Sequence, residues 1–265
     1  MKQALPKVTK PMNSVVITQV AQRQWDAVED GRVIGRGEAT SRPDNRIFVS
    51  IDSWRDTVFH QIADTMLADL PTPLYTIVDG FDQELAANWT RAGFVTGRRE
   101  WEYVVPTDPG VTGLNAALAP SDVTVVPVGG ADEGPLRELD RAIRAEVEAT
   151  VGWHTMPAEV LPRPNGVTVV YPTRYAVAVR DEEYVGLVRV APVTRQPRIG
   201  LIAVLAGQRR RGIARALLAN VLGSLHGNGI ASASAEVHED NAAAIALFEG
   251  IGARRAGSNL ELVRR

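Results

Sequence analysis

The chain contains no cysteine, and its only lysines are Lys2, Lys7 and Lys10, all near the N-terminus. The absence of cysteine excludes disulfides, cysteine-ligated zinc and a cysteine nucleophile. The absence of lysine after Lys10 removes lysine as a nucleophile or Schiff base from the folded body. No other metal-binding motif is present, so we expect no metal cofactor.

Long apolar runs and a strong net charge are also missing. No run approaches the roughly 18–20 apolar residues of a membrane-spanning helix, and the basic, proline-broken segment 1–14 lacks the apolar centre of a secretion signal. With a net charge of -2 and a pI near 6.1, the chain has no general attraction to nucleic acid or anionic membranes. We therefore expect a cytoplasmic protein without nucleic-acid or membrane partners.

The 265 residues, 45% of them hydrophobic, suffice for one large core or two domains of about 130 residues each. Segment 107–120 is poor in charge and bracketed by Pro and Gly, which predicts a linker. The resulting division is a domain at 1–106, a linker at 107–120 and a second domain at 121–265.

Hydrophobic periodicity predicts an α/β chain with many strands. Strands are expected at 15–20, 25–29, 33–39, 46–51, 74–78 and 99–105, and after the linker at 123–128, 175–179, 184–190, 199–205, 231–237 and 260–263. Helices are expected at 57–70, 134–152, 214–225 and 241–250.

The two halves repeat one another. Asn241 is followed by Phe248 and, eleven residues after the Asn, by Gly252; Asp82 is followed by Trp89 and Gly93 at the same spacings. A repeat of about 100 residues indicates a duplicated domain, because solenoid repeats have periods of roughly 20–50 residues.

The stretch Arg209-Arg210-Arg211-Gly212-Ile213-Ala214 lies between an apolar strand pattern and a helix pattern. A helix N-terminus offers unpaired N–H groups and the positive end of the macrodipole, which together favour phosphate. Glycine lets the backbone approach an oxyanion, and arginine supplies fork-shaped donors. An isolated charge run is more often a solvated loop, but this setting favours a pyrophosphate site.

That stretch resembles the R/Q-x-x-G-x-G/A motif of the GNAT N-acetyltransferase superfamily. The later stretch AEVHEDNAAAIALFEGIGA (235–253) resembles a second conserved block of the same family, in family order. The resemblance implies two GNAT-like folds in tandem, each a twisted, mixed, mostly antiparallel sheet flanked by helices. The resemblance is supported by motifs at 123–265. At 15–106 only the pattern of helices and strands supports it, and another small β-rich domain is an alternative there.

The resemblance implies acetyl-CoA as the acyl donor. Backbone N–H groups from Arg209 to Ala214 would hold the pyrophosphate, and Asn241 would meet the pantetheine or its thiol end. The strand edge formed by Ile202, Ala203 and Val204 would pair with the pantetheine arm.

Two residues are candidates for the base that deprotonates the attacking amine. Glu236 leads, because Ala235-Glu236-Val237 is similar to the Leu-Glu-Val run of ribosomal-protein N-terminal acetyltransferases, where the Glu is the base. His238 lies on the same strand face, and an unperturbed His titrates near pH 6.5. Phe248 stands where many family members have a Tyr that protonates the leaving thiolate, so the general acid is not identified.

The acceptor pocket is expected within 140–165, where Trp153 and His154 are the candidate substrate-binding residues. Acidic and aromatic side chains there suit a cationic amine, although each residue taken singly is better explained as helix surface or core.

The first half is expected to have lost the phosphate turn. Gly212 corresponds to Thr57, Ala214 to Phe59 and Arg209 to Trp54, so side chains would crowd the backbone. We expect this domain not to bind CoA and to complete the acceptor cleft or cover a surface.

Three functions follow from the sequence. The first is acetyl transfer to a primary amine of a small molecule, by a monomer or homodimer; the second is acetylation of protein N-termini or lysines. The third is a non-catalytic acyl-CoA sensor, which the absence of a Tyr at position 248 favours.

Overall fold

The computed structural model describes residues 14–42, 44–114, 120–150, 152, 168–191 and 196–265. Its chain forms two compact units. Unit 1 comprises 1–78, 82–96 and 262–265, and unit 2 comprises 79–81 and 97–261. In the described part of the chain, no helix is long and apolar enough to cross a membrane.

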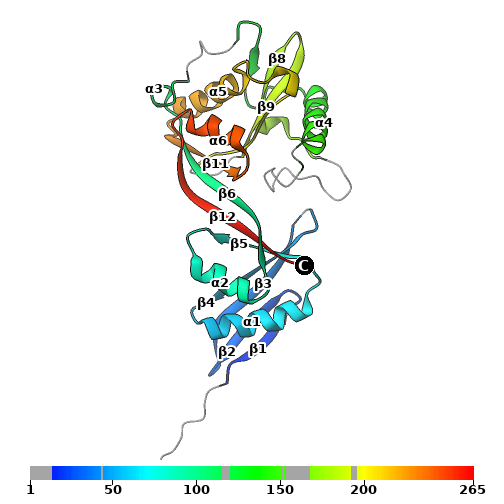
Figure 1. Cartoon of the computed structure of the whole chain (residues 1–265), viewed down its shortest axis with the longest axis vertical. Coiled ribbons are helices and arrows are strands. Elements are labelled where there is room, and N and C mark those ends of the chain that lie inside the picture. Colours follow the sequence, from blue (N-terminus) through cyan, green and yellow to red (C-terminus); the bar gives the residue numbers. More distant parts are fainter. Residues whose placement is uncertain (1–13, 43, 115–119, 151, 153–167, 192–195) are drawn as a thin grey trace, which may run out of the picture. The chain divides into compact units, whose positions relative to one another are not determined.

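Unit 1 is a sheet covered by helices (Figure 1). Its elements are β1 (Val16–Ala21), β2 (Gln24–Glu29), β3 (Arg32–Ser41), β4 (Ile47–Ser53), α1 (Asp56–Asp69), β5 (Leu74–Asp79) and α2 (Gln83–Arg91). Strands β1 to β4 pair antiparallel in chain order, whereas β5 runs parallel to β4. Helix α1 contacts β2, β3 and β4. Its apolar side chains recur every three to four residues and are buried there: Val58, Phe59, Ile62 and Met66.

Unit 2 contains the second series of elements. They are β6 (Val95–Pro106), α3 (Pro109–Thr112), β7 (Thr124–Val126), α4 (Glu133–Ala149), η4 (Pro172–Arg174), β8 (Tyr175–Arg180), β9 (Glu183–Ala191), β10 (Arg198–Val204), η5 (Ala206–Gln208), α5 (Ile213–Gly227), β11 (Ser232–His238), α6 (Ala242–Glu249) and β12 (Arg254–Arg264). Strands β6 and β11 are antiparallel, β10 and β11 are parallel, and β7 to β10 form an antiparallel series.

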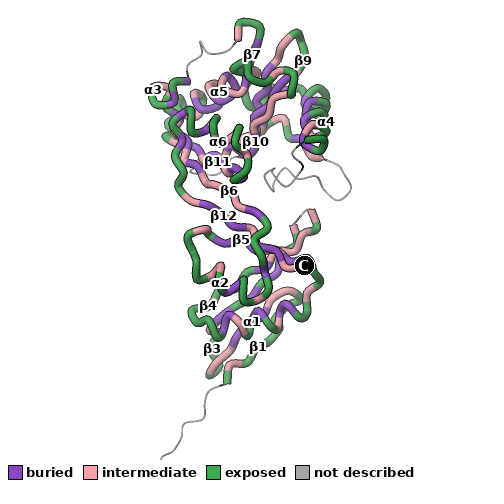
Figure 2. The backbone as a smooth tube through the Cα atoms, viewed as in Figure 1, coloured by how far each residue is buried: buried purple, intermediate pink, exposed green. Residues whose placement is uncertain are grey.

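Helices α4 and α5 cover opposite faces of β8 and β9 (Figure 1). The alternation along β8 places Ala176 and Ala178 in the core that contains α5, and Tyr175 and Val177 in the core that contains α4. Figure 2 shows buried positions recurring along both helices. Because each face of these strands is covered, Tyr175 to Ala178 are all buried.

Each helix and strand predicted from the sequence is present, but several bounds differ, and helix α2 was not among the predicted helices. Strand β6 begins at Val95 rather than 99, β12 begins at Arg254 rather than 260, and the short helix α3 lies inside the predicted linker. The first residues of β12 are mostly polar and were not predicted to form a strand, yet their side chains form hydrogen bonds with β6. Asn259 Nδ2 donates to Glu102 Oε1 over 2.7 Å, and Arg255 Nε donates to the Tyr103 hydroxyl over 2.9 Å.

The compact units do not follow the boundary expected from sequence. Residues 97–106, assigned from sequence to the first domain, lie in unit 2, and Leu262–Arg265 lie in unit 1. The reason for the first difference is pairing, because β6 matches β11 residue by residue from Glu100 with His238 to Pro106 with Ser232. A strand from the first half of the sequence therefore completes the second unit.

The predicted duplication is visible at α2 and α6. The Asp82 side chain accepts a hydrogen bond from Leu85 N (2.9 Å), and the Asn241 side chain accepts one from Ala244 N (3.0 Å). Both helices thus begin with the same side-chain N-cap. Both are followed, at the same distance, by a glycine of positive φ: 90° at Gly93 and 78° at Gly252.

Candidate active site

Strands β10 and β11 separate partway along their length. They pair in parallel only at Arg198 with Ser234 and Ile199 with Ala235, whereas β10 continues to pair with β9 as far as Val204. Beyond Ile199, no described strand pairs with the β11 side of β10, which leaves a strand edge at which an extended ligand can add backbone hydrogen bonds. The edge includes Ile202, Ala203 and Val204, as expected from sequence.

The turn after β10 leads directly into helix α5. Gly212 is its N-cap with a φ of 85°, and Arg210 also has a positive φ, 64°. Ala216 N donates to Gly212 O over 3.0 Å, so the preceding N–H groups of Ile213, Ala214 and Arg215 have no intrahelical acceptor. Left-handed residues within such a turn point successive N–H groups into one concavity, which suits an anion.

Helix α4 supports this turn through Glu146. Its carboxylate accepts hydrogen bonds from Ala206 N, at 3.0 Å from each oxygen, and from Arg209 Nη2 at 2.9 Å. Arg209 Nε in turn donates to Val204 O over 3.0 Å. Sequence reasoning assigned Glu146 to helix surface or to the acceptor pocket and missed this contact, which joins residues 60 positions apart.

The three arginines therefore differ. The Arg209 side chain fixes the turn, and its backbone N–H donates to Ala206 O over 3.3 Å. Arg210 and Arg211 are exposed, as is Gly212. The anion-facing donors expected from Arg209 to Ala214 accordingly begin after Arg209.

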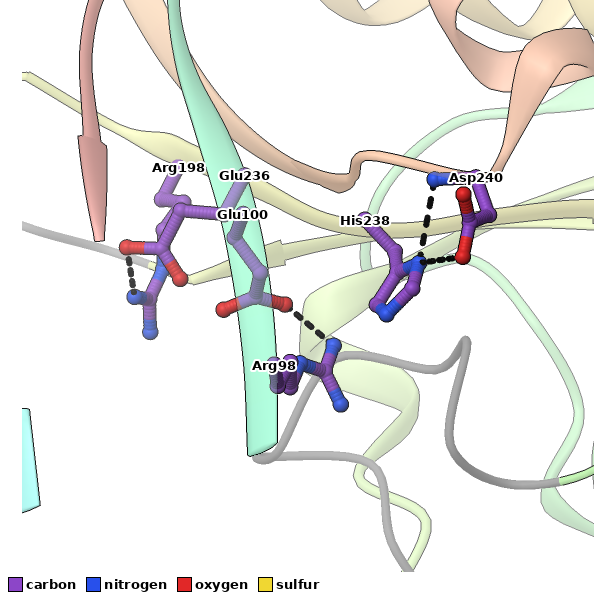
Figure 3. Close-up of polar contacts among 6 residues, drawn as sticks. All are labelled: Arg98, Glu100, Arg198, Glu236, His238 and Asp240. Carbon is purple, nitrogen blue, oxygen red and sulfur yellow. Dashed lines mark hydrogen bonds and ion pairs between the residues drawn. The ribbon is translucent and has the colours of Figure 1, made fainter. Parts of the chain in front are cut away.

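A polar face extends across β6 and β11 beside the point where β10 and β11 separate. Glu236 is paired with Glu102, and His238 with Glu100. Directly paired residues share a face, and so do residues two apart, which adds Arg98 to this face. Figure 3 shows Arg98, Glu100, Glu236 and His238 near one another, together with Arg198 from β10.

Each candidate base has a close partner on this face. Arg198 Nη1 lies 3.1 Å from Glu236 Oε1. The His238 ring is buried, and its Nδ1 accepts a hydrogen bond from Asp240 N over 3.2 Å, while an Asp240 carboxylate oxygen lies 3.9 Å away. Acceptance at Nδ1 assigns the proton of the neutral ring to Nε2.

Glu100 is a third carboxylate on this face, which sequence reasoning did not select. Its side chain is only 13% exposed and pairs with that of Arg98. Burial raises the pKa of Glu100; the Arg98 charge lowers it, and the charges of Glu236 and Glu261 raise it further. No sequence signal marks Glu100, because its setting depends on a strand from the first half pairing with β11.

Asn241 and Phe248 both serve the start and packing of α6. Asn241 Oδ1 caps the helix, and Phe248 is 3% exposed with its ring stacked on Tyr103, at 6.0 Å between centroids. The Tyr103 hydroxyl donates to Glu249 Oε1 (3.0 Å) and accepts from Arg255, while burial raises the Tyr103 pKa. Trp153 and His154 lie outside the described residues.

Residues 145–253 match the model of the acetyltransferase (GNAT) family. Within these residues the chain is similar to the GNAT acetyltransferases. A search of curated proteins found no significant match.

Solved structures show that the GNAT likeness extends over nearly the whole chain. A GCN5-related N-acetyltransferase from Sphaerobacter thermophilus shares 17% identity at a TM-score of 0.62, covering 93% of this chain and 82% of its own. A tandem GNAT protein from the clavulanic acid biosynthesis pathway shares 17% identity at 0.61, covering 91% and 81%. A GCN5-related N-acetyltransferase from Kribbella flavida shares 15% identity at 0.56, covering 95% and 90%. The fold is therefore that of two GNAT-like domains in tandem.

The first GNAT-like repeat keeps the separated strands but not the anion site. Strands β4 and β5 pair only at Ile47 with Leu74 and Phe48 with Tyr75. Helix α1 begins after Arg55, which gives it no side-chain cap, and Asp56 occupies its first turn. An Asp56 oxygen accepts a hydrogen bond from Asn88 Nδ2 over 3.0 Å. A carboxylate thus stands where the second repeat has exposed backbone.

Proposed function

We propose that the protein transfers an acetyl group from acetyl-CoA to a primary amine of a small molecule. The observation that carries this proposal is the conjunction, in unit 2, of the separated β10 and β11 strands with the Gly212-capped start of α5. Acetyl-CoA is a pyrophosphate joined to an extended, amide-containing arm, so its two parts match the anion-binding turn and the strand edge.

The polar face supports a cationic acceptor. Two of its carboxylates, those of Glu100 on β6 and Glu236 on β11, lie on the side of the sheet away from the core that holds Phe248. Carboxylates attract an ammonium group, and one of them can remove its proton. The amine nitrogen then attacks the thioester carbonyl carbon, the C–S bond breaks, and the CoA thiolate takes up a proton.

Release of free CoA thiol tests this function directly. The full-length protein is incubated with acetyl-CoA and, separately, with spermidine, glucosamine, L-lysine and a peptide carrying both a free N-terminus and a lysine. We expect thiol release above the hydrolysis background with at least one small amine, and the acetylated amine in the mass spectrum.

The other outcomes point to different functions. Release with the peptide alone would indicate a protein acetyltransferase. Acetyl-CoA binding by calorimetry without release for any acceptor would indicate a sensor, the reading that the apolar, buried Phe248 favours. Gly212→Glu is the control, because it removes the proposed donor site while leaving every residue of the polar face in place.

A further inference from the structure

Strand β6 brings a carboxylate from the first half of the sequence into the polar face of unit 2. Glu100 is paired with His238, two residues along β11 from Glu236. The neighbouring position, Glu102, is paired with Glu236 itself. In the view of Figure 3, the Glu100 carboxylate lies between that of Glu236 and the His238 ring.

The three candidate proton acceptors on this face differ in their surroundings. Glu236 is 29% exposed at its side chain and is held by Arg198 across the join between β10 and β11. His238 Nδ1 is occupied by a backbone donor. Glu100 is less exposed than Glu236, at 13%, and lies among further carboxylates.

The charged and titratable groups around Glu100 act in both directions. They are Arg98 on its own strand, Glu236 and His238 on β11, and Glu261 on β12. Burial and the charges of the two other carboxylates outweigh the charge of Arg98 and its hydrogen bond to one oxygen, so the net effect raises the pKa of Glu100 above its usual value. A carboxyl shifted in this direction is a better proton acceptor near neutral pH.

Arg98 provides a second, independent observation. Its side chain is 9% exposed, and its Nε is buried without a hydrogen-bond partner among the described residues. A buried, unsatisfied guanidinium N–H is costly, and a ligand oxygen at this face would satisfy it. Arg98 and Glu100 therefore form a donor and acceptor pair within the same buried part of the polar face.

We propose that Glu100 is the general base of the acetyl transfer, and that Glu236, fixed by Arg198, is a positioning residue for the acceptor ammonium. This inference rests on the proposed function. The ammonium gives one proton to the Glu100 carboxylate, the resulting amine attacks the thioester carbon, and the C–S bond breaks. The second nitrogen proton neutralises the departing thiolate, and Glu100 returns its proton to water.

The assignment gives the first repeat a chemical role. That repeat has lost its own phosphate turn, yet the strand that follows its last helix supplies the base of the second repeat. The active site is then composite, with the acetyl-CoA site formed by β10 and α5 and the base supplied by β6.

The test compares Glu100→Gln with Glu102→Gln in the full-length protein, using acetyl-CoA with spermidine, glucosamine or L-lysine. We expect Glu100→Gln to lower kcat by about 100-fold or more, in the range of general base catalysis. The dissociation constant for acetyl-CoA should change less than about twofold, since Glu100 is remote in sequence and strand from the donor turn. Glu102→Gln, on the same strand and face, retains an acceptor for Asn259 and should keep kcat.

The pH profile separates a base from a structural residue. The base must be deprotonated, so wild-type kcat/KM should fall as pH drops through the raised pKa of Glu100. In Glu100→Gln this fall in kcat/KM at low pH should disappear. The remaining rate should rise only at the higher pH at which the amine loses its proton without a base. Glu236→Gln should instead raise the KM for the amine, while the fall in kcat/KM at low pH is retained.

Each outcome decides the matter. A Glu100→Gln protein with wild-type kcat and pH profile would overturn the assignment and leave the proposed function standing. If the wild-type protein releases no thiol with any of the amines, the proposed function is overturned, and this inference with it. If Glu100→Gln fails to fold because Arg98 loses its partner, the Arg98→Gln/Glu100→Gln double variant is used, because it removes both charges. We expect the double variant to show the same loss of kcat. Wild-type turnover in the double variant would also overturn the assignment.

Discussion

At the residue scale, Gly212 controls the approach of an anion to helix α5. Its φ of 85° lies in the left-handed region, and it is the exposed N-cap of the helix. An L-residue in that conformation costs about 1–2 kcal/mol. The neighbouring arginines contribute in different ways, since Arg209 is turned back onto Glu146 and Val204.

We expect Gly212→Ala to weaken acetyl-CoA binding about tenfold, because the free variant relaxes out of the left-handed conformation and must regain it to bind, and 1.4 kcal/mol corresponds to a factor of ten. Gly212→Glu should abolish binding, because it adds a carboxylate where the pyrophosphate would lie. Isothermal titration calorimetry measures both, with Gly223→Ala as the matched control inside α5, where a Cβ meets no atom within 4 Å. Wild-type affinity in Gly212→Glu would remove the pyrophosphate from this turn.

At the scale of elements, the proposed donor site depends on the contact between α4 and the turn before α5. Glu146 accepts from Ala206 N and Arg209, and Arg209 reaches Val204 at the end of β10. One side chain therefore connects a helix, a strand end and the phosphate turn. Gly186 on β9 adds to this fit, because a Cβ there would lie 3.2 Å from Ala203 O and 3.3 Å from an Ile213 side-chain atom.

Removal of this support is expected to affect acetyl-CoA binding rather than chemistry. Glu146→Ala should raise the KM for acetyl-CoA about five- to tenfold, since hydrogen bonds to charged groups contribute roughly 1.5–3 kcal/mol when buried and less at a half-exposed arginine. The kcat should stay near its wild-type value. Glu148→Ala, exposed on the same helix, is the control. Tighter binding in Glu146→Ala would show instead that Glu146 competes with phosphate for Arg209.

At the scale of the whole molecule, the boundary between the compact units does not coincide with the boundary between the two halves of the sequence. Unit 2 includes residues 97–106, whose strand pairs along the full length of β11. Two side chains of this strand are almost fully buried in the core of unit 2, Tyr103 at 1% and Val105 at 0% exposure. The second GNAT-like domain is therefore incomplete without part of the first half.

A fragment starting at residue 107 should consequently be insoluble or lack cooperative unfolding. It leaves the β11 edge unpaired, opens the core at the Tyr103 and Val105 positions, and deletes Glu100. Circular dichroism on heating and the thiol-release assay measure the effect, beside a fragment starting at Gly97 that retains most of β6. A soluble 107–265 fragment with full-length turnover would contradict both the structural dependence and the role of Glu100.

Much of the fold was predictable because its signals are local. Apolar periodicity located the helices and strands of both halves, and the equal spacings from Asp82 to Gly93 and from Asn241 to Gly252 revealed the duplication. The place of the proposed acetyl-CoA site could be predicted for a similar reason, because the strand end, the turn and the helix start are consecutive from Ile202 to Ala214. The N-cap role of Asn241 could be anticipated from its residue type and place, although its contact with a ligand stays a prediction.

Other features of the fold depend on which segments distant in the sequence come into contact, and no local sequence signal specifies these contacts. The polar run Arg254–Asn259 became strand because it bonds to β6, and Glu146 joined the phosphate turn because α4 packs beside β9. The assignment of 97–106 to unit 2 likewise follows from pairing with β11.

By itself, then, the sequence determined the resemblance to GNAT acetyltransferases, the duplication and the place of the proposed donor site, because the residues that carry each of them are close together in the chain. Only the tertiary structure decided how the polar face is composed. It pairs Glu236 with Arg198 and brings Glu100 beside His238. The physical reason is that a side chain's burial and charge neighbours, and hence its pKa, are set by strand register between segments more than a hundred residues apart.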